Sequence, residues 1–307
     1  MEHLVFQSFD EYAAAVQHAN IRVTLSSRQQ THWALDYMPL GDVSVQWGQD
    51  AGPNVVEGSS SEGGLTLFLP RCSADSIIGN GCRMQDGSVM LLEPGAEFCM
   101  AAMAANRWAS IFVPFDQLTA LGVPSTGPNQ KRTGLSPTEA RKRLRVLVES
   151  LSIASRNVPA ALRQTSAVTA ARNKIAQAVG DALGLQKEAT IAPGRHALSR
   201  VQITRSALQI LEEYSDEQIS VGRLANMIGI SERTLRTTFE EYFGVGPTRF
   251  LKVRTLHQAR KLLKRADPHA TNVTEIAVGL GIWELGRFAR DYKLLFDEFP
   301  SETLRNA

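Results

Sequence analysis

The chain has 307 residues, of which 43% are apolar and 21% are charged. These values are typical of globular proteins and exclude a disordered, collagen-like or purely coiled-coil protein, and the length favours two or three domains. Three cysteines without a Cys-x-x-Cys pair indicate neither a disulfide framework nor a thiolate zinc site. Because the N-terminus has no signal-peptide pattern and no apolar run approaches the roughly 18 residues of a membrane span, we expect a soluble cytoplasmic protein.

The formal net charge of +2 is distributed unevenly along the chain. Residues 1–130 hold 5 Lys and Arg against 13 Asp and Glu, whereas residues 131–200 hold 13 against 4. Residues 201–307 are close to neutral, with 15 against 14. Phosphate attracts the basic middle and repels the acidic first part, so we expect residues 1–130 to be turned away from any nucleic-acid partner.

Short apolar or alternating runs, separated by turn sequences such as GPN, SSSEGG, GNG and QDG, fill the region from about Arg22 to Phe115. Alternation with period two and Gly-rich separators are typical of antiparallel strands joined by hairpins. The pattern therefore predicts a small β-sandwich or barrel. The expected strands include VSVQW (43–47), LTLFLP (65–70), SVMLLEPG (88–95) and ASIFVPF (109–115).

Residues 138–156 and 162–186 show the apolar spacing of amphipathic helices. The apolar row of the first helix suits packing on the sheet or a dimer seam, and both interpretations stay open. Residues 188–200 show no clear period and contain Pro193-Gly194, which indicates a linker. The apolar row consists of Leu144, Leu147, Val148 and Leu151.

Two short helices separated by a glycine turn are predicted in residues 219–243. Gly229 permits the left-handed conformation that ends the first helix, and Ser231 is suited to cap the second. Because the polar face of the second helix is free to enter a major groove, the pattern predicts a helix-turn-helix unit. The residues expected to pack the two helices together are Leu224, Ala225, Ile228, Leu235 and Phe239.

The pattern is repeated about 53 residues later, in residues 274–296. A long amphipathic helix, residues 247–266, connects the two copies and would hold them rigidly. Two recognition helices held about one helical turn of duplex apart, roughly 34 Å, can enter successive major grooves on one face of DNA. The matched pairs are Leu224 with Ile276, Ala225 with Ala277, Gly229 with Gly281, Leu235 with Phe288 and Phe239 with Tyr292.

With these motifs, residues 201–305 resemble the DNA-binding domain of the AraC/XylS family of bacterial transcriptional regulators. The resemblance implies a regulator that binds double-stranded DNA, works with RNA polymerase, responds to a small-molecule effector and activates more often than it represses. The charge asymmetry and the apolar row of the first helix predict that it forms a homodimer through its N-terminal half. The matching motifs are L-A-x5-S-x3-L-x3-F at Leu224-Ala225, Ser231, Leu235 and Phe239; G-x-x-P at Gly244 and Pro247, continued by Phe250, Arg254 and Ala259; I-A-x3-G at Ile276-Ala277 and Gly281; and F-x-R-x-aromatic-K at Phe288, Arg290, Tyr292 and Lys293.

Three positions depart from the family pattern. Thr237 replaces the usual Arg two positions after the Leu of the first unit, Ile282 replaces the usual Phe after Gly281, and Asp297 stands in the region where Gly usually precedes the last Pro. The second and third departures predict a different turn in the second unit.

The N-terminal region resembles, more loosely, the cupin-like effector domains that precede such DNA-binding domains, especially in QDGSVMLLEPGAEFCM and WASIFVPFDQL. Metal-binding cupins need clustered His and a carboxylate, yet no histidine lies between Val43 and Phe115. We therefore expect no metal and no cofactor, and a role in sensing an organic ligand or in structure. The candidate effector-binding residues, which could equally fill the β-core, are Trp33, Trp47, Phe98 and Trp108.

The candidate DNA-binding residues occupy the turns and the predicted outer faces of the second helices. A solvated face would also carry arginine, but the duplicated helix-turn-helix favours base reading. Arg290 and Lys293 suit phosphate or orienting contacts, and Trp283 suits either a groove contact or packing on the neighbouring unit. The set is Ser231, Glu232, Arg233, Arg236, Thr237, Trp283, Gly286, Arg287, Ala289, Arg290 and Lys293.

The competing classes are an enzyme and a module that binds protein instead of DNA. We expect no catalytic residues, because G-x-S-x-G, Walker and G-x-G-x-x-G motifs are absent, and Glu93 and Glu97 flank a Pro-Gly turn without a nucleophile nearby. The sequence predicts an α+β multidomain protein in four segments. These are a β-rich cupin-like domain (1–134), a helical connector or dimerisation segment (135–187), a linker (188–200) and an all-α domain with two helix-turn-helix units (201–307).

Overall fold

The computed structural model describes residues 2–26, 33–71, 77–85, 87–120, 138–158, 164–183, 195–215 and 217–307. The chain forms two compact units, one drawn mainly from Met1–Ala192 and the other mainly from Pro193–Ala307. The expected boundaries after residues 134 and 187 lie outside the described residues. Helix α5 begins at Arg195, so the last part of the expected linker is helical.

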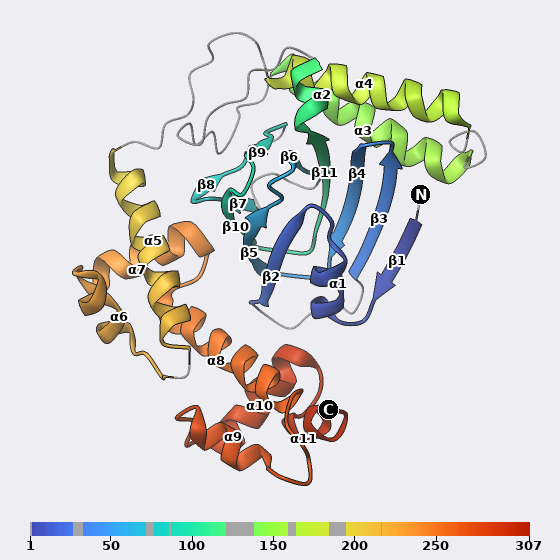
Figure 1. Ribbon diagram of the computed structural model, residues 1–307. Coiled ribbons are helices and arrows are strands. Elements are labelled where there is room, and N and C mark those ends of the chain that lie inside the picture. Colours follow the sequence, from blue (N-terminus) through green and yellow to red (C-terminus); the bar gives the residue numbers. More distant parts are fainter. Residues whose placement is uncertain are drawn as a thin grey trace. The chain divides into compact units, whose positions relative to one another are not determined.

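The N-terminal unit is built on two β-sheets (Figure 1). The six-stranded sheet has the order β1-β3-β4-β11-β6-β9 with antiparallel neighbours, and the five-stranded sheet has the order β2-β5-β10-β7-β8. The strands are β1 (Glu2–Phe6), β2 (Ala19–Leu25), β3 (Trp33–Leu40), β4 (Val43–Asp50), β5 (Asn54–Ser60), β6 (Gly64–Pro70), β7 (Ile77–Gly79), β8 (Cys82–Arg83), β9 (Met90–Leu92), β10 (Glu97–Ala102) and β11 (Asn106–Pro114).

These strands confirm the β-rich N-terminal domain. β4 and β6 contain two of the expected runs, and β11 contains the third except for Phe115, which begins helix α2 (Phe115–Ala120), whereas the run 88–95 forms a strand only at β9. That strand is short because Pro94 cannot donate a hydrogen bond to a sheet and Gly95 turns the chain with a φ of 64°. Strand β1 and the short helix α1 (Phe9–Ala15), which Ser8 caps, correspond to no element predicted from the sequence.

One face of the six-stranded sheet is covered by the helices α3 (Glu139–Asn157) and α4 (Thr165–Leu183), which lie side by side (Figure 1). Leu144 and Val148 of α3 and Ile175 of α4 are almost completely buried against strands β4, β6 and β11. The apolar row of α3 therefore packs on the sheet of its own chain, because that contact removes it from water, and it is not open to a second chain. The prediction that this row forms a dimer seam is therefore wrong.

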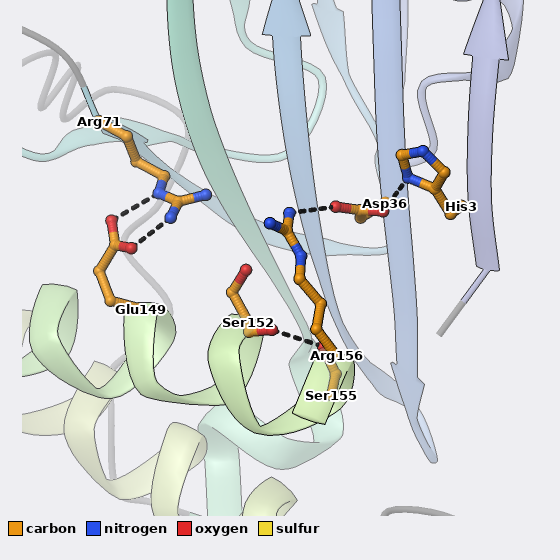
Figure 2. Close-up of polar contacts among 7 residues, drawn as sticks. All are labelled: His3, Asp36, Arg71, Glu149, Ser152, Ser155 and Arg156. Atoms are coloured by element: carbon orange, nitrogen blue, oxygen red, sulfur yellow. Dashed lines mark hydrogen bonds and ion pairs between the residues drawn. The ribbon is translucent and has the colours of Figure 1, made fainter. Parts of the chain in front are cut away.

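Ion pairs also hold α3 against the sheet (Figure 2). Asp36 of β3, whose side chain is only 7% exposed, accepts from Arg156 of α3 at 3.0 Å and contacts Nδ1 of His3 of β1 at 2.6 Å. Two turns earlier along α3, on the same side of the helix, Arg71 donates two hydrogen bonds to Glu149. The orientation of α3 on the sheet is thus fixed by directional contacts as well as by apolar burial.

The described residues 195–215 and 217–307 form helices and contain no strand, which confirms the predicted all-α domain. The connector α8 is shorter than the expected 247–266 and contacts the helices on both sides of it, namely α6 and α7 before it and α9, α10 and α11 after it. Its buried residues include Phe250, Leu256 and Ala259, as the amphipathic pattern predicts. The helices are α5 (Arg195–Glu213), α6 (Val221–Ile228), α7 (Glu232–Phe243), α8 (Pro247–Leu263), α9 (Val273–Gly279), α10 (Leu285–Phe296) and α11 (Pro300–Arg305); α2 (Phe115–Ala120) belongs to the N-terminal unit.

Across the described parts of the chain, helices are too short or too polar to span a lipid bilayer.

Candidate nucleic-acid interface

The first helical pair, α6 and α7, has the helix-turn-helix geometry that its sequence predicts. The side chain of Ser220 caps α6, and Gly229 ends it in the left-handed conformation with a φ of 78°. After Gly229 the chain turns, and the Ile230 N–H donates to the Ala225 carbonyl at 3.0 Å. Ser231 then caps α7 by accepting from the Thr234 N–H at 3.1 Å. Local chemistry therefore defines both ends of the turn.

The two helices are held together by a small apolar core. Leu224, Ala225, Leu235 and Phe239 are each at most 1% exposed. Phe239 also packs edge-on against Phe250 of α8, with ring centroids 5.3 Å apart. Since α8 contributes to this core, the first recognition helix, α7, is fixed to the connector.

The second pair, α9 and α10, repeats this geometry. Gly281 has a φ of 71°, and the Ile282 N–H donates to the Ala277 carbonyl at 2.9 Å, as Ile230 does to Ala225. At the end of α10, Asp297 adopts the left-handed conformation that Gly244 adopts at the end of α7. Asp tolerates this conformation better than most residues, so the third departure leaves the end of the second unit unchanged. The turn itself differs, because α10 begins four residues after Gly281 whereas α7 begins three residues after Gly229.

The beginnings of the two recognition helices differ. Ser231 caps α7, whereas Glu284, the residue before α10, makes no side-chain cap and instead approaches Arg287 at 3.3 Å. Arg287 also lies 3.8 Å from Asp291, whose carboxylate in turn accepts from Lys252 of α8 at 2.6 Å. The second recognition helix, α10, is thus tied to the connector by an ionic contact that the sequence pattern did not reveal.

The outer face of α7 carries two unengaged cations. Arg233 and Arg236 are exposed and have no ion-pair partner among the described residues. Thr237 is exposed and donates to the Arg233 carbonyl at 3.1 Å, and Glu232 places its Oε1 2.8 Å from where a Cβ of Gly222 would lie, at the start of α6. Of the candidates on α7, the two arginines are therefore the side chains most available to a partner.

The outer face of α10 combines cations with uncharged positions. Arg290 is exposed, and Lys293 donates to the Asp297 carbonyl and lies 5.3 Å from the ring centre of Phe299. Trp283 and Gly286 are exposed at the start of the helix, and Ala289 is half-buried. The structure therefore places the sequence-predicted residues of the second unit on or beside one outer surface, with Lys293 partly used by its own helix.

Another arginine of the family motif makes its contacts within the domain. Arg254 of α8 donates to the Leu211 carbonyl near the end of α5 and approaches Glu212 at 3.5 Å. Its side chain is only 15% exposed. The contact joins α5 to the connector and explains why the domain needs a long, forked cation there.

The four candidate effector-binding residues are not gathered in one place. Trp33 packs against Tyr12 with ring centroids 4.9 Å apart, and Trp108 donates to the Tyr12 hydroxyl at 3.0 Å. Trp47 lies in the core beneath α3 and α4, on the other face of the sheet, and Phe98 lies on β10 of the second sheet. Trp33 and Trp108 thus share a cluster through Tyr12, and Trp47 does not belong to it.

Two recognition helices in tandem on one connecting helix, with cations on their outer faces, define a helix-turn-helix DNA-binding domain. The family described as a helix-turn-helix domain matches residues 224–306. The chain is 42% identical over 103 residues to the probable thc operon regulatory protein of Rhodococcus erythropolis and 38% identical over 98 residues to the XylDLEGF operon transcriptional activator of Pseudomonas putida. The C-terminal domain of this chain belongs to the AraC/XylS type of helix-turn-helix domains.

The likeness to these relatives is confined to part of each protein. The aligned segments cover 34% and 32% of this chain and 31% and 30% of the two regulators. Among solved structures, a probable AraC family transcriptional regulator from Rhodopseudomonas palustris is 36% identical, over 34% of this chain and 97% of the other, with a TM-score of 0.32. The AraC-like transcriptional activator CuxR is 15% identical, over 84% and 95%, with a TM-score of 0.45.

Proposed function

We propose that this chain is a sequence-specific regulator of transcription that binds double-stranded DNA through α7 and α10. The observation that carries the proposal is the repeated helix-turn-helix geometry around α8, with Arg233 and Arg236 unengaged on α7. The names of the two regulators with similar C-terminal domains support a role in operon control, and that of the XylDLEGF activator supports activation. The proposal assigns the chain no catalytic activity and places it in the bacterial cytoplasm, where it works with RNA polymerase.

Binding to a duplex selected from a random pool should weaken steeply with salt, because cations displace condensed counterions from phosphate. Each neutralised phosphate contributes a slope of about −0.9 to the logarithmic dependence of affinity on salt. Fluorescence anisotropy at several salt concentrations measures this slope, which Arg233→Ala should reduce by about 1 if Arg233 contacts phosphate. Arg305→Ala, which removes an exposed cation of α11, is the matched control and should leave the slope unchanged. A salt-independent affinity would contradict DNA binding and favour the protein-interaction module.

The N-terminal unit is proposed to bind a small organic effector and to mediate dimerisation. The support for ligand sensing is the resemblance of the β-rich unit to cupin-like effector domains; the buried cluster of Trp33, Tyr12 and Trp108 belongs to the core of that unit. Dimerisation must use a surface other than the buried row of α3. Val146 and Ile153 lie on the opposite face of α3 and are 64% and 59% exposed, which favours that face as the seam.

Replacing Val146 and Ile153 by Glu should convert a dimer to a monomer without unfolding the chain. Both side chains are exposed in the single chain, so the change costs little stability, whereas facing carboxylates across a seam repel each other and lose apolar contact. Sedimentation of the full chain measures the change in mass. Ser150→Glu is not a suitable control, because it lies on the same face; Lys174→Glu on α4 is. A wild-type chain that is monomeric at micromolar concentration would contradict the proposed seam.

A further inference from the structure

Trp283 is the most exposed of the large apolar side chains in the described part of the chain, at 77%. It directly precedes Glu284, the residue before the first residue of α10, Leu285. Large aromatic residues are usually well buried, so an almost fully exposed indole on a folded domain indicates an interaction surface. Nothing in the packing of the C-terminal unit accounts for its exposure.

Gly286, the second residue of α10, lies three positions after Trp283 and is also exposed. A Cβ added to Gly286 would meet no atom within 4 Å, so the protein's own packing does not require a glycine there. Glycine is a poorer helix former than alanine, and close approach of the backbone to a ligand is a common reason for a glycine at a helical position. The missing side chain therefore points to a partner that comes close to the first turn of α10.

The charges on this surface identify the class of partner. With a period of 3.6 residues, Gly286 and Arg290 share one face of α10, opposite the buried Phe288 and Tyr292, and the exposed Trp283 lies in the turn two residues before that helix begins. Exposed Arg290 on the same face favours a polyanion, and the helix is the second helix of a helix-turn-helix. In the major groove, the 5-methyl group of thymine is the apolar feature of the base edges, and the bases are otherwise read through hydrogen bonds.

We propose that Trp283 and the open position at Gly286 form a site that recognises the 5-methyl group of thymine in the part of the binding site read by α10. This inference rests on the proposed function. The indole covers the methyl group, and the absence of a side chain at Gly286 lets the base edge approach the helix. Arg290 holds the adjacent phosphate backbone.

The test uses the full chain and a duplex selected from a random pool, in which each thymine is replaced in turn by deoxyuridine. Deoxyuridine keeps the base pair and removes only the methyl group. Burying one methyl group stabilises a complex by about 0.8 kcal/mol, so we expect the affinity to fall about fourfold at one or two thymines in the half read by α10. Trp283→Ala should weaken binding to the thymine duplex and show no further loss with deoxyuridine, whereas Trp283→Phe should retain the sensitivity.

Gly286→Ala provides a second and independent measurement. The added methyl group has open space in the free protein, so thermal stability should be unchanged or higher, while affinity for the duplex should fall. Gly180→Ala, at a helical glycine of α4 that also has no neighbour within 4 Å, should change neither DNA affinity nor its dependence on the methyl group.

Three results would overturn the inference. The first is a Trp283→Ala variant as sensitive to deoxyuridine as the wild type. The second is duplex binding with the expected salt dependence but no thymine position that responds, which would leave the proposed function intact. The third is a Trp283→Ala variant that binds DNA normally but fails to stimulate transcription, which would assign Trp283 to a protein contact. If no duplex is bound at all, both the proposed function and this inference fail.

Discussion

Replacing Arg236 by Ala is expected to weaken binding to a selected duplex by about 1–3 kcal/mol and to relax the base preference at one position. Arg236 is exposed on α7 and has no ion-pair partner within the described residues, so its guanidinium breaks no ion pair of the protein when it binds DNA. A bidentate contact from such a side chain to guanine is the most frequent specific contact in the major groove. Selection from a randomised pool, followed by affinity measurement on the selected site, gives both quantities.

Arg287→Ala should have a smaller effect on affinity than Arg236→Ala. Arg287 lies 3.3 Å from Glu284 and 3.8 Å from Asp291, and these contacts must be given up or shared when it binds DNA. Arg305→Ala, on the exposed surface of α11, serves as the control for loss of charge alone. Unchanged base preference in both Arg236→Ala and Arg287→Ala would remove these residues as readers of sequence.

Replacing Asp50 by Ala is expected to destabilise the N-terminal unit by about 3 kcal/mol or more, because it leaves several buried donors unsatisfied. Asp50 is 4% exposed and accepts from the Tyr12 hydroxyl at 2.5 Å and from Asn106 at 2.9 Å. It also accepts from the Trp108 indole at 3.1 Å. Chemical denaturation of the full chain, followed by tryptophan fluorescence, measures the loss.

The control for Asp50 is Asp42→Ala, because the Asp42 side chain is 41% exposed and its pairing with Arg172 spans 3.8 Å. Exposed pairs of this kind contribute about 0–1 kcal/mol. If the two variants lose similar stability, the buried network around Asp50 does not hold the unit together.

The same network gives the stability a dependence on alkaline pH. Burial, and then the charge of Asp50, raise the pKa of Tyr12 well above its usual 10.0. The unfolded chain releases this proton near pH 10.0, whereas the folded chain keeps it to higher pH. The contribution of Tyr12 to stability is therefore complete below that value and is lost as pH rises above it. Denaturation at about pH 9 and about pH 11 should show the loss, and Tyr12→Phe should remove it. If the Tyr12→Phe variant loses as much stability between these two pH values as the wild type, the loss belongs to other titrating groups.

The helix-turn-helix units were predictable because their signals are local. Gly229 and Gly281 both take the left-handed conformation that their positions in the pattern require, and Ser231 caps α7 through an N–H three residues away. The buried anchors Leu235 and Phe288 follow from helical spacing alone. Each of these features depends on residues within one or two turns, so a single sequence contains the necessary information.

The partner of the apolar row on α3 was decided only by the tertiary structure. Helical spacing shows that Leu144 and Val148 must leave water, but a sheet of the same chain and a helix of a second chain satisfy that requirement equally well. The structure buries them on the six-stranded sheet, fastened by Arg156 to Asp36, a residue 120 positions away in the sequence.

Strand register likewise decided on which face of the sheet each tryptophan lies. Trp47 and Trp108 lie on adjacent strands, yet Trp47 pairs with Ala109 and Trp108 with Gly48, which sends the two side chains to opposite faces of the sheet. A shift of one residue would exchange those faces, and no local pattern specifies the shift. The sequence by itself therefore determined the elements whose caps and apolar spacing are local, above all the two DNA-reading units. Which surfaces meet was decided by the tertiary structure, because hydrophobic burial is non-directional and only the register and the long-range polar contacts select among the partners that would satisfy it.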